Sequence, residues 1–328
     1  MSIPFVVFIH GPTATGKTEL AVRAAELFKG EIINCDSVQV YGSLDVGAAK
    51  PSREQLDRAT HHLIGHVADG HTYTAGEYRR DALEVIASRF KEGVDLFFVV
   101  GGSGFYSQAL VKGLYPVPPS DPAVRADLQE RLTRDGLGAL FAELEGRDPG
   151  YARKIGPNDR YRIVRALEVL ATSGFSTMKD VLVAFESQRP PFRYVQVGLN
   201  HLRSRLRERV EFRTRAMLRA GLADETRALL ARGLGPWPAL RSVGYKECVD
   251  ALEGRLPFEE LETMIAQSTM QLAKRQMTWF RRDRRIVWFD TQFDAAAPLI
   301  YLHEVTRAVR LDSGLPPPDT GSTRGVTA

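Results

Sequence analysis

Apolar residues occur in short runs near the amino terminus, and segments with helical spacing alternate with these runs. The apolar runs occupy residues 3–10, 31–35 and 94–100, and the helical patterns occupy residues 17–28 and 76–92. In the first helical pattern, the apolar residues that share a face are Leu20, Ala24, Leu27 and Phe28. Fully apolar strands that alternate with helices are typical of a parallel sheet covered on both faces. The pattern therefore predicts an α/β fold.

The alternation changes at residues 115–122, where prolines at four positions break any regular element. From there to about residue 187 the apolar spacing is helical only, with Val124, Leu128 and Leu132 on one face. Residues 194–199 then form another apolar run. We therefore expect a core of residues 1–115 and 191–312, interrupted by a helical insertion domain at 116–190.

The second part of the core contains two long helical patterns and one more strand pattern. A basic helix is expected at residues 202–220, a long helix at 258–280, a strand at 286–289 and a final helix after it. Residues 313–328 are rich in Gly, Pro, Ser and Thr, so we expect a disordered tail there.

Composition is that of a soluble globular protein. The 328 residues are 44% hydrophobic and 26% charged, with a formal net charge of +4. Arginines concentrate in residues 203–219 and 274–285, so a nucleic-acid face would use the second half of the chain, although solvated helix faces are an alternative. Cys35 and Cys248 lie far apart and indicate neither a zinc site nor a disulfide framework. We expect a cytoplasmic monomer that does not associate with membranes.

A phosphate-binding motif lies between the first strand and the first helix. Its residues, which match GxxxxGK[ST], are Gly11, Pro12, Thr13, Ala14, Thr15, Gly16, Lys17 and Thr18. Glycines let backbone amides face one concavity, and the helix dipole adds positive potential there. Lys17 would neutralise a terminal phosphate, and the Thr18 hydroxyl would bind Mg²⁺. This P-loop predicts phosphate binding without deciding between a nucleoside triphosphate and some other diphosphate.

Asp36 ends the second strand, at the sheet edge where the P-loop is expected. Its carboxylate could hold magnesium or accept a proton from an attacking nucleophile. A third reading is an aspartate that only caps a turn. The residues alone leave these roles open.

Several segments in order resemble the tRNA dimethylallyltransferase (IPP transferase) family, from about residue 5 to 290. These segments are Asp36–Tyr41, Asp45–Pro51, His61–Leu63, Tyr78–Ala82, Gly101–Tyr106, Asn158–Asp159, Arg165–Glu168, Arg241–Tyr245 and Gln271–Gln276. Their joint occurrence is far more specific than the P-loop alone. Three positions depart from the family pattern: Ala48 and Ser103 replace threonines, and Gly65 replaces a frequent aspartate.

The resemblance implies a prenyltransferase that modifies tRNA. It would transfer a dimethylallyl group from dimethylallyl diphosphate to the exocyclic N6 amine of the adenosine 3′-adjacent to the anticodon, with Mg²⁺ as cofactor. The implied catalytic residues are Asp36, Thr18 and Ser103. Arg203 would join the P-loop in diphosphate binding, and Thr18 would hold the metal.

The resemblance also implies a set of residues that contact the anticodon stem-loop. These are Asp36, Ser37, Val38, Gln39, Ser103, Arg125, Tyr161, Arg162, Ile163, Val164, Arg165, Arg241, Ser242, Val243, Gly244, Tyr245, Lys246, Lys274, Arg275, Arg281 and Arg282. Because an anticodon loop is single-stranded, its adenosine can leave the stack at a cost of only about a few kcal/mol.

Three rival functions make different predictions. A small-molecule P-loop kinase would explain Gly11–Thr18 equally well, but not the distal basic segments or the Asp36–Tyr41 run. A prenyltransferase acting on free adenine nucleotides needs no extended phosphate-binding surface. A non-catalytic RNA-binding protein predicts that Asp36 can be replaced without loss of function.

Overall fold

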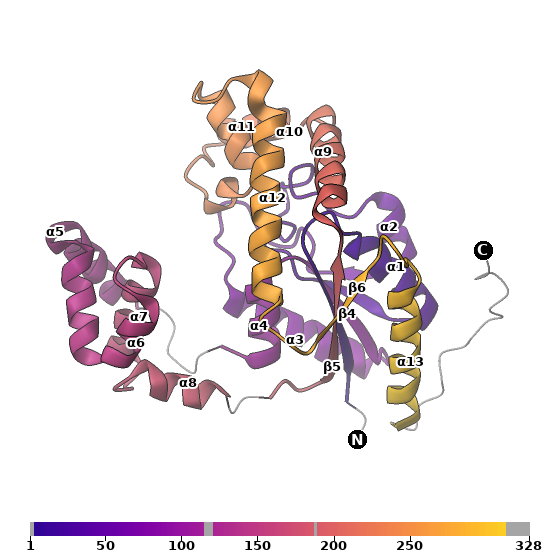
Figure 1. The fold of residues 1–328 in the computed structure, drawn as a ribbon, viewed down its shortest axis with the longest axis horizontal. Helices are drawn as coiled ribbons and strands as arrows, with labels where there is room; N and C mark the ends of the chain where they lie inside the picture. Colours follow the sequence, from indigo (N-terminus) through magenta and orange to yellow (C-terminus); the bar gives the residue numbers. More distant parts are fainter. Residues whose placement is uncertain (1–2, 115–120, 187–188, 313–328) are drawn as a thin grey trace. The chain divides into compact units, whose positions relative to one another are not determined.

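A computed structural model of the protein describes residues 3–114, 121–186 and 189–312. The chain forms two compact units, Met1–Leu110 with Pro191–Ala328, and Val111–Pro190 (Figure 1). The expected start of the insertion at residue 116 and the expected tail at 313–328 lie outside the described residues. Within these residues, no helix is both long and apolar enough to cross a membrane.

The first unit is built on a six-stranded parallel sheet with the order β3-β2-β4-β1-β5-β6. Its strands are β1 (Phe5–His10), β2 (Glu31–Asn34), β3 (His61–His62), β4 (Leu96–Val100), β5 (Arg193–Asn200) and β6 (Ile286–Asp290). The α/β fold with a parallel sheet is confirmed. The sequence reading missed β3, because a two-residue strand of histidines shows no apolar run.

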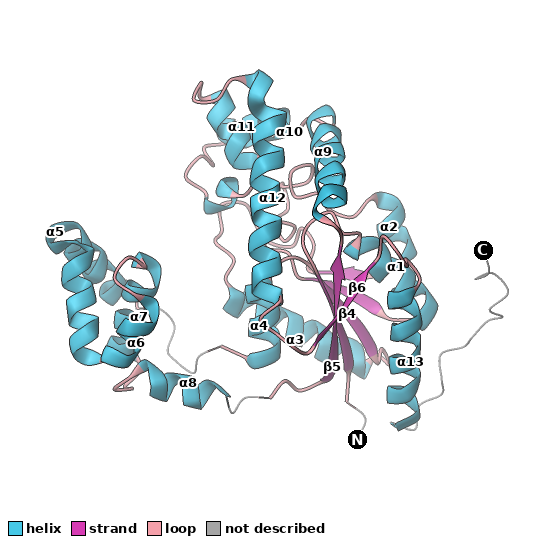
Figure 2. Cartoon of the chain, viewed as in Figure 1, coloured by secondary structure: helices cyan, strands magenta, loops and turns pink. Residues whose placement is uncertain are grey.

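Helices α1 (Lys17–Phe28) and α13 (Ala297–Asp312) cover one face of the sheet (Figure 2). Their core includes Ala21, Ala25 and Phe28 from α1 and Leu302 from α13, packed on β1 and β4. Leu27, expected on the inward face, is 55% exposed. The expectation was wrong because the buried face extends toward the small residues Ala21 and Ala25, which leaves Leu27 beyond its edge.

Helices α3 (Ala75–Lys91) and α4 (Gly104–Lys112) lie on the opposite face of the sheet (Figure 2). Tyr78 of α3 stacks on Tyr106 of α4 with ring centroids 4.5 Å apart. Thr74 is the N-cap residue of α3 and forms a capping box with Glu77. The carboxyl end of α12 (Leu261–Phe280) also reaches this face, where Phe280 stacks on His10 of β1 at 4.6 Å.

The other helices of this unit are α2 (Arg53–Arg58), α9 (Arg203–Arg219), α10 (Leu222–Ala231) and α11 (Tyr245–Leu252). The structure places the expected basic helix at α9, and it divides the expected helix at 258–280 into a short 3₁₀ turn (Phe258–Glu260) and α12. Leu206 and Val210 of α9 pack against Ala266 and Ala273 of α12. The two helices stand together beyond the carboxyl edge of the sheet (Figure 1).

The second unit contains α5 (Pro122–Arg147), α6 (Pro149–Ile155), α7 (Arg160–Thr172) and α8 (Met178–Glu186). The side chains of Asp121, Asp148 and Asp159 accept backbone N–H groups at the starts of α5, α6 and α7. Helix α5 is interrupted at Gly136, whose φ is 80°. The apolar residues that form the core of this unit include Leu128, Leu144, Ile163, Leu167 and Val181.

Candidate active site

Glycines at two positions allow the backbone shape of the P-loop. Gly11 has φ 140°, and a Cβ there would lie 2.5 Å from the carbonyl oxygen of Leu199. Gly16 has φ 88° and directly precedes α1, which begins at Lys17. The loop therefore wraps the amino terminus of α1, where free backbone N–H groups and the helix dipole favour an anion.

Polar side chains inside the loop fix its shape. The Thr15 hydroxyl donates to the carbonyl oxygen of Pro12 at 2.8 Å, and the Lys17 ammonium donates to the same oxygen at 2.7 Å. Burial lowers the pKa of Lys17 to about 8, an effect that Asp36 opposes and Arg213 reinforces. The site thus holds a desolvated cation, which binds anions more strongly than a solvated one.

Asp36 follows β2 and does two things at once. Its Oδ1 accepts the backbone N–H groups of Val38 at 2.9 Å and Gln39 at 3.4 Å, so the carboxylate caps a turn. Among the contacts of the described residues, its Oδ2 accepts no hydrogen bond, and Asp36 lines the same cavity as Lys17. Turn capping and a chemical role are therefore compatible in one side chain.

That cavity has a volume of about 770 Å³ and lies at the carboxyl edge of the sheet. P-loop residues, the ends of β2 and β4, and one face of α9 form its walls. The lining residues are Thr13, Ala14, Gly16, Lys17, Thr18, Glu19, Asp36, Gln39, Ala49, Gln55, Val100, Gly101, Gly102, Arg205, Glu208, Arg209, Phe212, Arg213, Arg215 and Gln276. This is the crevice in which open α/β sheets bind ligands.

Helix α9 turns an arginine face toward the P-loop, with Arg205, Arg209 and Arg213 spaced four residues apart. Arg209 Nε donates to the carbonyl oxygen of Ala14 at 2.6 Å, and Arg213 donates to the Thr13 hydroxyl at 3.1 Å. Burial lowers the pKa of Arg213, and Asp36 opposes that shift. Sequence reasoning singled out neither arginine, although their four-residue spacing was a usable signal.

Gln276 of α12 is a second residue that the sequence reading did not assign to the site. Its Oε1 accepts the backbone N–H of Thr13 at 3.0 Å, and its Nε2 donates to the carbonyl oxygen of Gly102 at 3.1 Å. A Cβ on Gly102 would lie 2.2 Å from Gln276 Nε2, so the glycine permits this approach. The side chain joins the P-loop to the end of β4.

Two residues expected in the chemistry lie outside the cavity wall. Arg203 is exposed at the first position of α9 and, among the described residues, does not line the cavity, whereas Arg205, Arg209 and Arg213 do. Ser103 caps α4, because its hydroxyl accepts the backbone N–H of Tyr106 at 3.3 Å. Its neighbours Gly101 and Gly102 reach the cavity instead.

The residues of the first unit that were expected to hold tRNA differ in solvent exposure. Arg241, Lys246, Lys274, Arg275, Arg281 and Arg282 are exposed. Lys246 pairs with Asp250 at 2.7 Å, while Ser242 and Val243 are half-buried. Gly244 and Tyr245 are buried, and the Tyr245 hydroxyl donates to Glu225.

In the second unit, Arg125, Arg162 and Tyr161 are exposed, with Tyr161 at 74%. Arg165 is half-buried and pairs with Glu168 at 2.9 Å. Ile163 and Val164, which were also expected to contact RNA, are buried. Both side chains belong to the apolar core of this unit, because the inward face of α7 includes them.

Thr18, the residue that the sequence predicted as the metal ligand, lines the cavity beside Lys17. Within residues 3–114, 121–186 and 189–312, no cluster of three or more His, Cys, Asp or Glu side chains is placed to hold a metal ion. Mg²⁺ commonly takes one or two protein oxygens and completes its shell with phosphate oxygens and water. The Thr18 hydroxyl fits that pattern as a single protein oxygen.

Comparison with known proteins identifies similar chains. The model of the IPP transferase family matches residues 39–283. A tRNA dimethylallyltransferase of Bdellovibrio bacteriovorus is 43% identical over 288 residues, covering 87% of this chain and 92% of that protein. One from Geobacter sulfurreducens is 38% identical over 297 residues, covering 90% and 95%.

Solved structures resemble this one over most of the chain. The full-length tRNA isopentenylpyrophosphate transferase of Bacillus halodurans is 30% identical with a TM-score of 0.70, covering 95% of this chain and 98% of that one. A eukaryotic dimethylallyltransferase acting on tRNA has a TM-score of 0.76 at 23% identity, covering 95% and 80%, which shows a shared fold.

Proposed function

The chain belongs to the IPP transferase family, and from that premise we propose how its cavity carries out tRNA prenylation. The enzyme transfers a dimethylallyl group from dimethylallyl diphosphate to the exocyclic N6 amine of the adenosine 3′-adjacent to the anticodon, and it releases diphosphate. One observation carries the assignment of roles: Lys17, Asp36 and Arg213 line a single cavity although they lie far apart in the sequence.

The P-loop and α9 bind the diphosphate that departs. Breaking the allylic carbon–oxygen bond builds negative charge on the leaving oxygen, and donors fixed beforehand stabilise that charge, each by roughly 3 kcal/mol. The Lys17 ammonium is held by its hydrogen bond to the carbonyl oxygen of Pro12, and the Arg213 guanidinium by its bond to the Thr13 hydroxyl. These donors need little reorganisation during the reaction.

Asp36 accepts the proton of the attacking amine. An exocyclic aromatic amine is a weak nucleophile, and a carboxylate within hydrogen-bond reach assists it by removing the proton as the new carbon–nitrogen bond forms. The turn bonds to Val38 and Gln39 hold Oδ1, so Oδ2 remains available to the amine.

Thr18 would hold a divalent cation, which we propose to be Mg²⁺, together with the diphosphate and water. When bound, the cation adds positive charge at the leaving group. The Thr18 side chain is half-buried at the cavity wall, one residue from Lys17, so both would face the same end of the donor.

The exposed cations hold the tRNA. Lys274 and Arg275 on α12, and Arg281 and Arg282 just beyond it, form no ion pair within the part of the chain that the structure describes. Arg241 is exposed in the same unit. On the second unit Arg125 and Tyr161 are exposed, as is Arg162, which pairs with Asp159 at 3.3 Å. Cations without protein partners are suited to phosphate oxygens, because no existing ion pair has to break.

Mass spectrometry of tRNA nucleosides tests the function directly. The purified protein would be incubated with unmodified tRNA, Mg²⁺ and dimethylallyl diphosphate, and the expected product is an adenosine carrying one dimethylallyl group next to the anticodon. Parallel incubations with labelled ATP and with AMP as acceptor distinguish the rivals. Transfer of the γ-phosphate without prenylation, or prenylation of AMP as fast as of tRNA, would contradict the proposal.

A further inference from the structure

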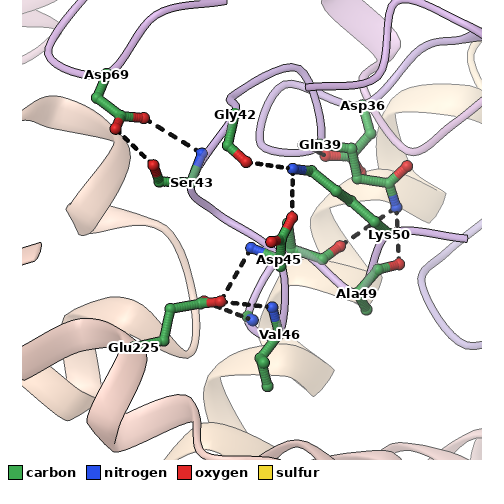
Figure 3. Close-up of polar contacts among 12 residues, drawn as sticks. Asp36, Gln39, Gly42, Ser43, Asp45, Val46, Ala49, Lys50, Asp69 and Glu225 are labelled. Carbon is green, nitrogen blue, oxygen red and sulfur yellow. Dashed lines mark hydrogen bonds and ion pairs between the residues drawn. The ribbon is translucent and has the colours of Figure 1, made fainter. Parts of the chain in front are cut away.

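We propose that Glu225 of α10 is a positioning residue that fixes Gln39 and Asp36 in the cavity by holding the loop of residues 45–49. Figure 3 shows the loop between Glu225 on one side and Gln39 on the other. Glu225 does not itself line the cavity among the described residues, so any effect on the reaction must pass through the loop. The proposal rests on the function proposed above.

The Glu225 carboxylate receives three successive backbone N–H groups. Its Oε2 accepts from Asp45 at 3.1 Å and from Val46 at 2.8 Å, and its Oε1 accepts from Gly47 at 3.2 Å. A carboxylate that accepts several backbone amides forms charge-assisted hydrogen bonds, which are stronger than neutral ones. One side chain from α10 therefore sets the path of a loop about 180 residues away in the sequence.

Tyr245 supports the contact between Glu225 and the loop of residues 45–49. Its side chain is fully buried, and its hydroxyl donates to Glu225 Oε1, which fixes the carboxylate's orientation. A Cβ on Gly47 would lie 2.4 Å from Tyr245 Cζ, so the loop must pass the ring without a side chain at this position. The family-like segments around Gly47 and Tyr245 thus meet at Glu225.

Gln39 connects the loop of residues 45–49 to the cavity. A turn closes where the backbone N–H of Ala49 donates to Val46 at 3.1 Å. Gln39 Nε2 then donates to the carbonyl oxygens of Ala48 at 3.3 Å and Ala49 at 3.1 Å. The Gln39 backbone N–H donates to Asp36 Oδ1, so a shift of the loop moves both cavity residues.

Lys50 closes the same loop from its other end. Its ammonium donates to Asp45 Oδ1 at 2.6 Å and to the carbonyl oxygen of Gly42 at 2.8 Å (Figure 3). Glu225 binds three backbone amides of residues 45–47, and Lys50 binds the carbonyl oxygen of Gly42. The loop is therefore held at both ends and has little freedom to change its conformation. We therefore expect loss of Glu225 to displace the loop rather than to be absorbed by it.

The first test compares Glu225→Gln with Asp224→Asn. Both remove one negative charge from the same turn of α10, but Asp224 is exposed and pairs only with Arg227 among its described contacts. Because a displacement of about 1 Å at a reacting group can cost ~100-fold, we expect E225Q to lower kcat for prenylation by at least ~10-fold. KM for dimethylallyl diphosphate should change less than about twofold, because the P-loop is untouched. D224N should match the wild type.

A parallel rise in KM, or a kcat equal to that of D224N, would overturn the positioning role.

A double-mutant cycle with Gln39→Ala gives a second readout. If Glu225 acts through Gln39, the double variant should be no more than about twofold slower than Q39A alone, whereas independent effects would multiply. If E225Q does not fold, Glu225→Asp, which keeps the carboxylate but shortens its reach, replaces it in the same comparisons. Wild-type protein that yields no prenylated adenosine would contradict the proposed function itself.

Discussion

At the scale of single residues, Asp36 combines structural and chemical constraints in one carboxylate. The backbone bonds at Oδ1 orient the group, and Lys17 and Arg213 face it across the cavity. Its negative charge raises the pKa of both cations against the effect of burial. Asp36 therefore helps to keep Lys17 and Arg213 positively charged, in addition to its proposed role as the base.

Replacing Asp36 by asparagine tests its proposed role as the base while preserving its role in the turn. Asparagine keeps an oxygen for the turn but cannot accept the proton, so single-turnover prenylation should fall by about 10²- to 10⁴-fold. Affinity for tRNA, measured by fluorescence anisotropy, should stay within about twofold of the wild type, because the exposed cations are unchanged. Retained prenylation would remove Asp36 as the base.

The depressed pKa of Lys17 predicts an alkaline limit on donor binding. Lys17 is positive below its pKa of about 8 and neutral above it, so its attraction for the diphosphate is lost as pH rises through that value. kcat/KM for dimethylallyl diphosphate, which reports the free enzyme, should decline toward about tenfold per pH unit above pH 8.

Lys17→Met is the matched control for this pH profile. The variant should have a low kcat/KM that no longer declines in this way, because the titrating group is gone. A wild-type profile that is level to pH 10 would show that the ammonium keeps its charge or does not contribute to binding.

At the scale of elements, the spacing of arginines on α9 decides which of them line the cavity. Arg209 and Arg213 hold the P-loop directly, whereas Arg203 at the helix start does not line the cavity. Arg213→Ala should raise KM for dimethylallyl diphosphate by ~10-fold or more, since hydrogen bonds to charged groups contribute about 1.5–3 kcal/mol.

The same measurement on Arg203→Ala tests the role that the family resemblance implied for that residue. Arg207→Ala is the control, because Arg207 is exposed on α9 and is absent from the cavity wall among the described residues. An effect of Arg203→Ala as large as that of Arg213→Ala would mean that α9 rearranges when the donor binds.

At the scale of the whole molecule, unpaired cations should make tRNA binding depend on salt. Log K should fall linearly with log salt concentration, with a slope of about −0.7 to −0.9 for each phosphate contacted. The double variant Arg281→Ala/Arg282→Ala should therefore reduce the slope by up to about 2. Arg307→Ala, on the exposed side of α13, should leave it unchanged. A wild-type affinity that is independent of salt would contradict the use of these cations for phosphate.

The sequence by itself determined the local features, because each depends on residues that are close along the chain. The apolar runs gave β1, β2 and β4 within two residues, and Gly11–Thr18 predicted a loop that the structure forms before α1. Periodicity also placed α9 and α12. Periodicity wrongly predicted that Leu27 is buried, because Leu27 lies at the edge of a helix face on which alanines are the buried residues.

Only the tertiary structure decided which distant residues meet. Arg213 and Gln276 contact the same P-loop residue, Thr13, from two different helices. Glu225 accepts hydrogen bonds from the backbone of a loop that begins at Asp45. The structure likewise shows that Ile163 and Tyr245 are buried, which their positions in the sequence motifs did not indicate. Such contacts depend on how helices pack against one another, and residue spacing along one chain segment contains no information about that packing.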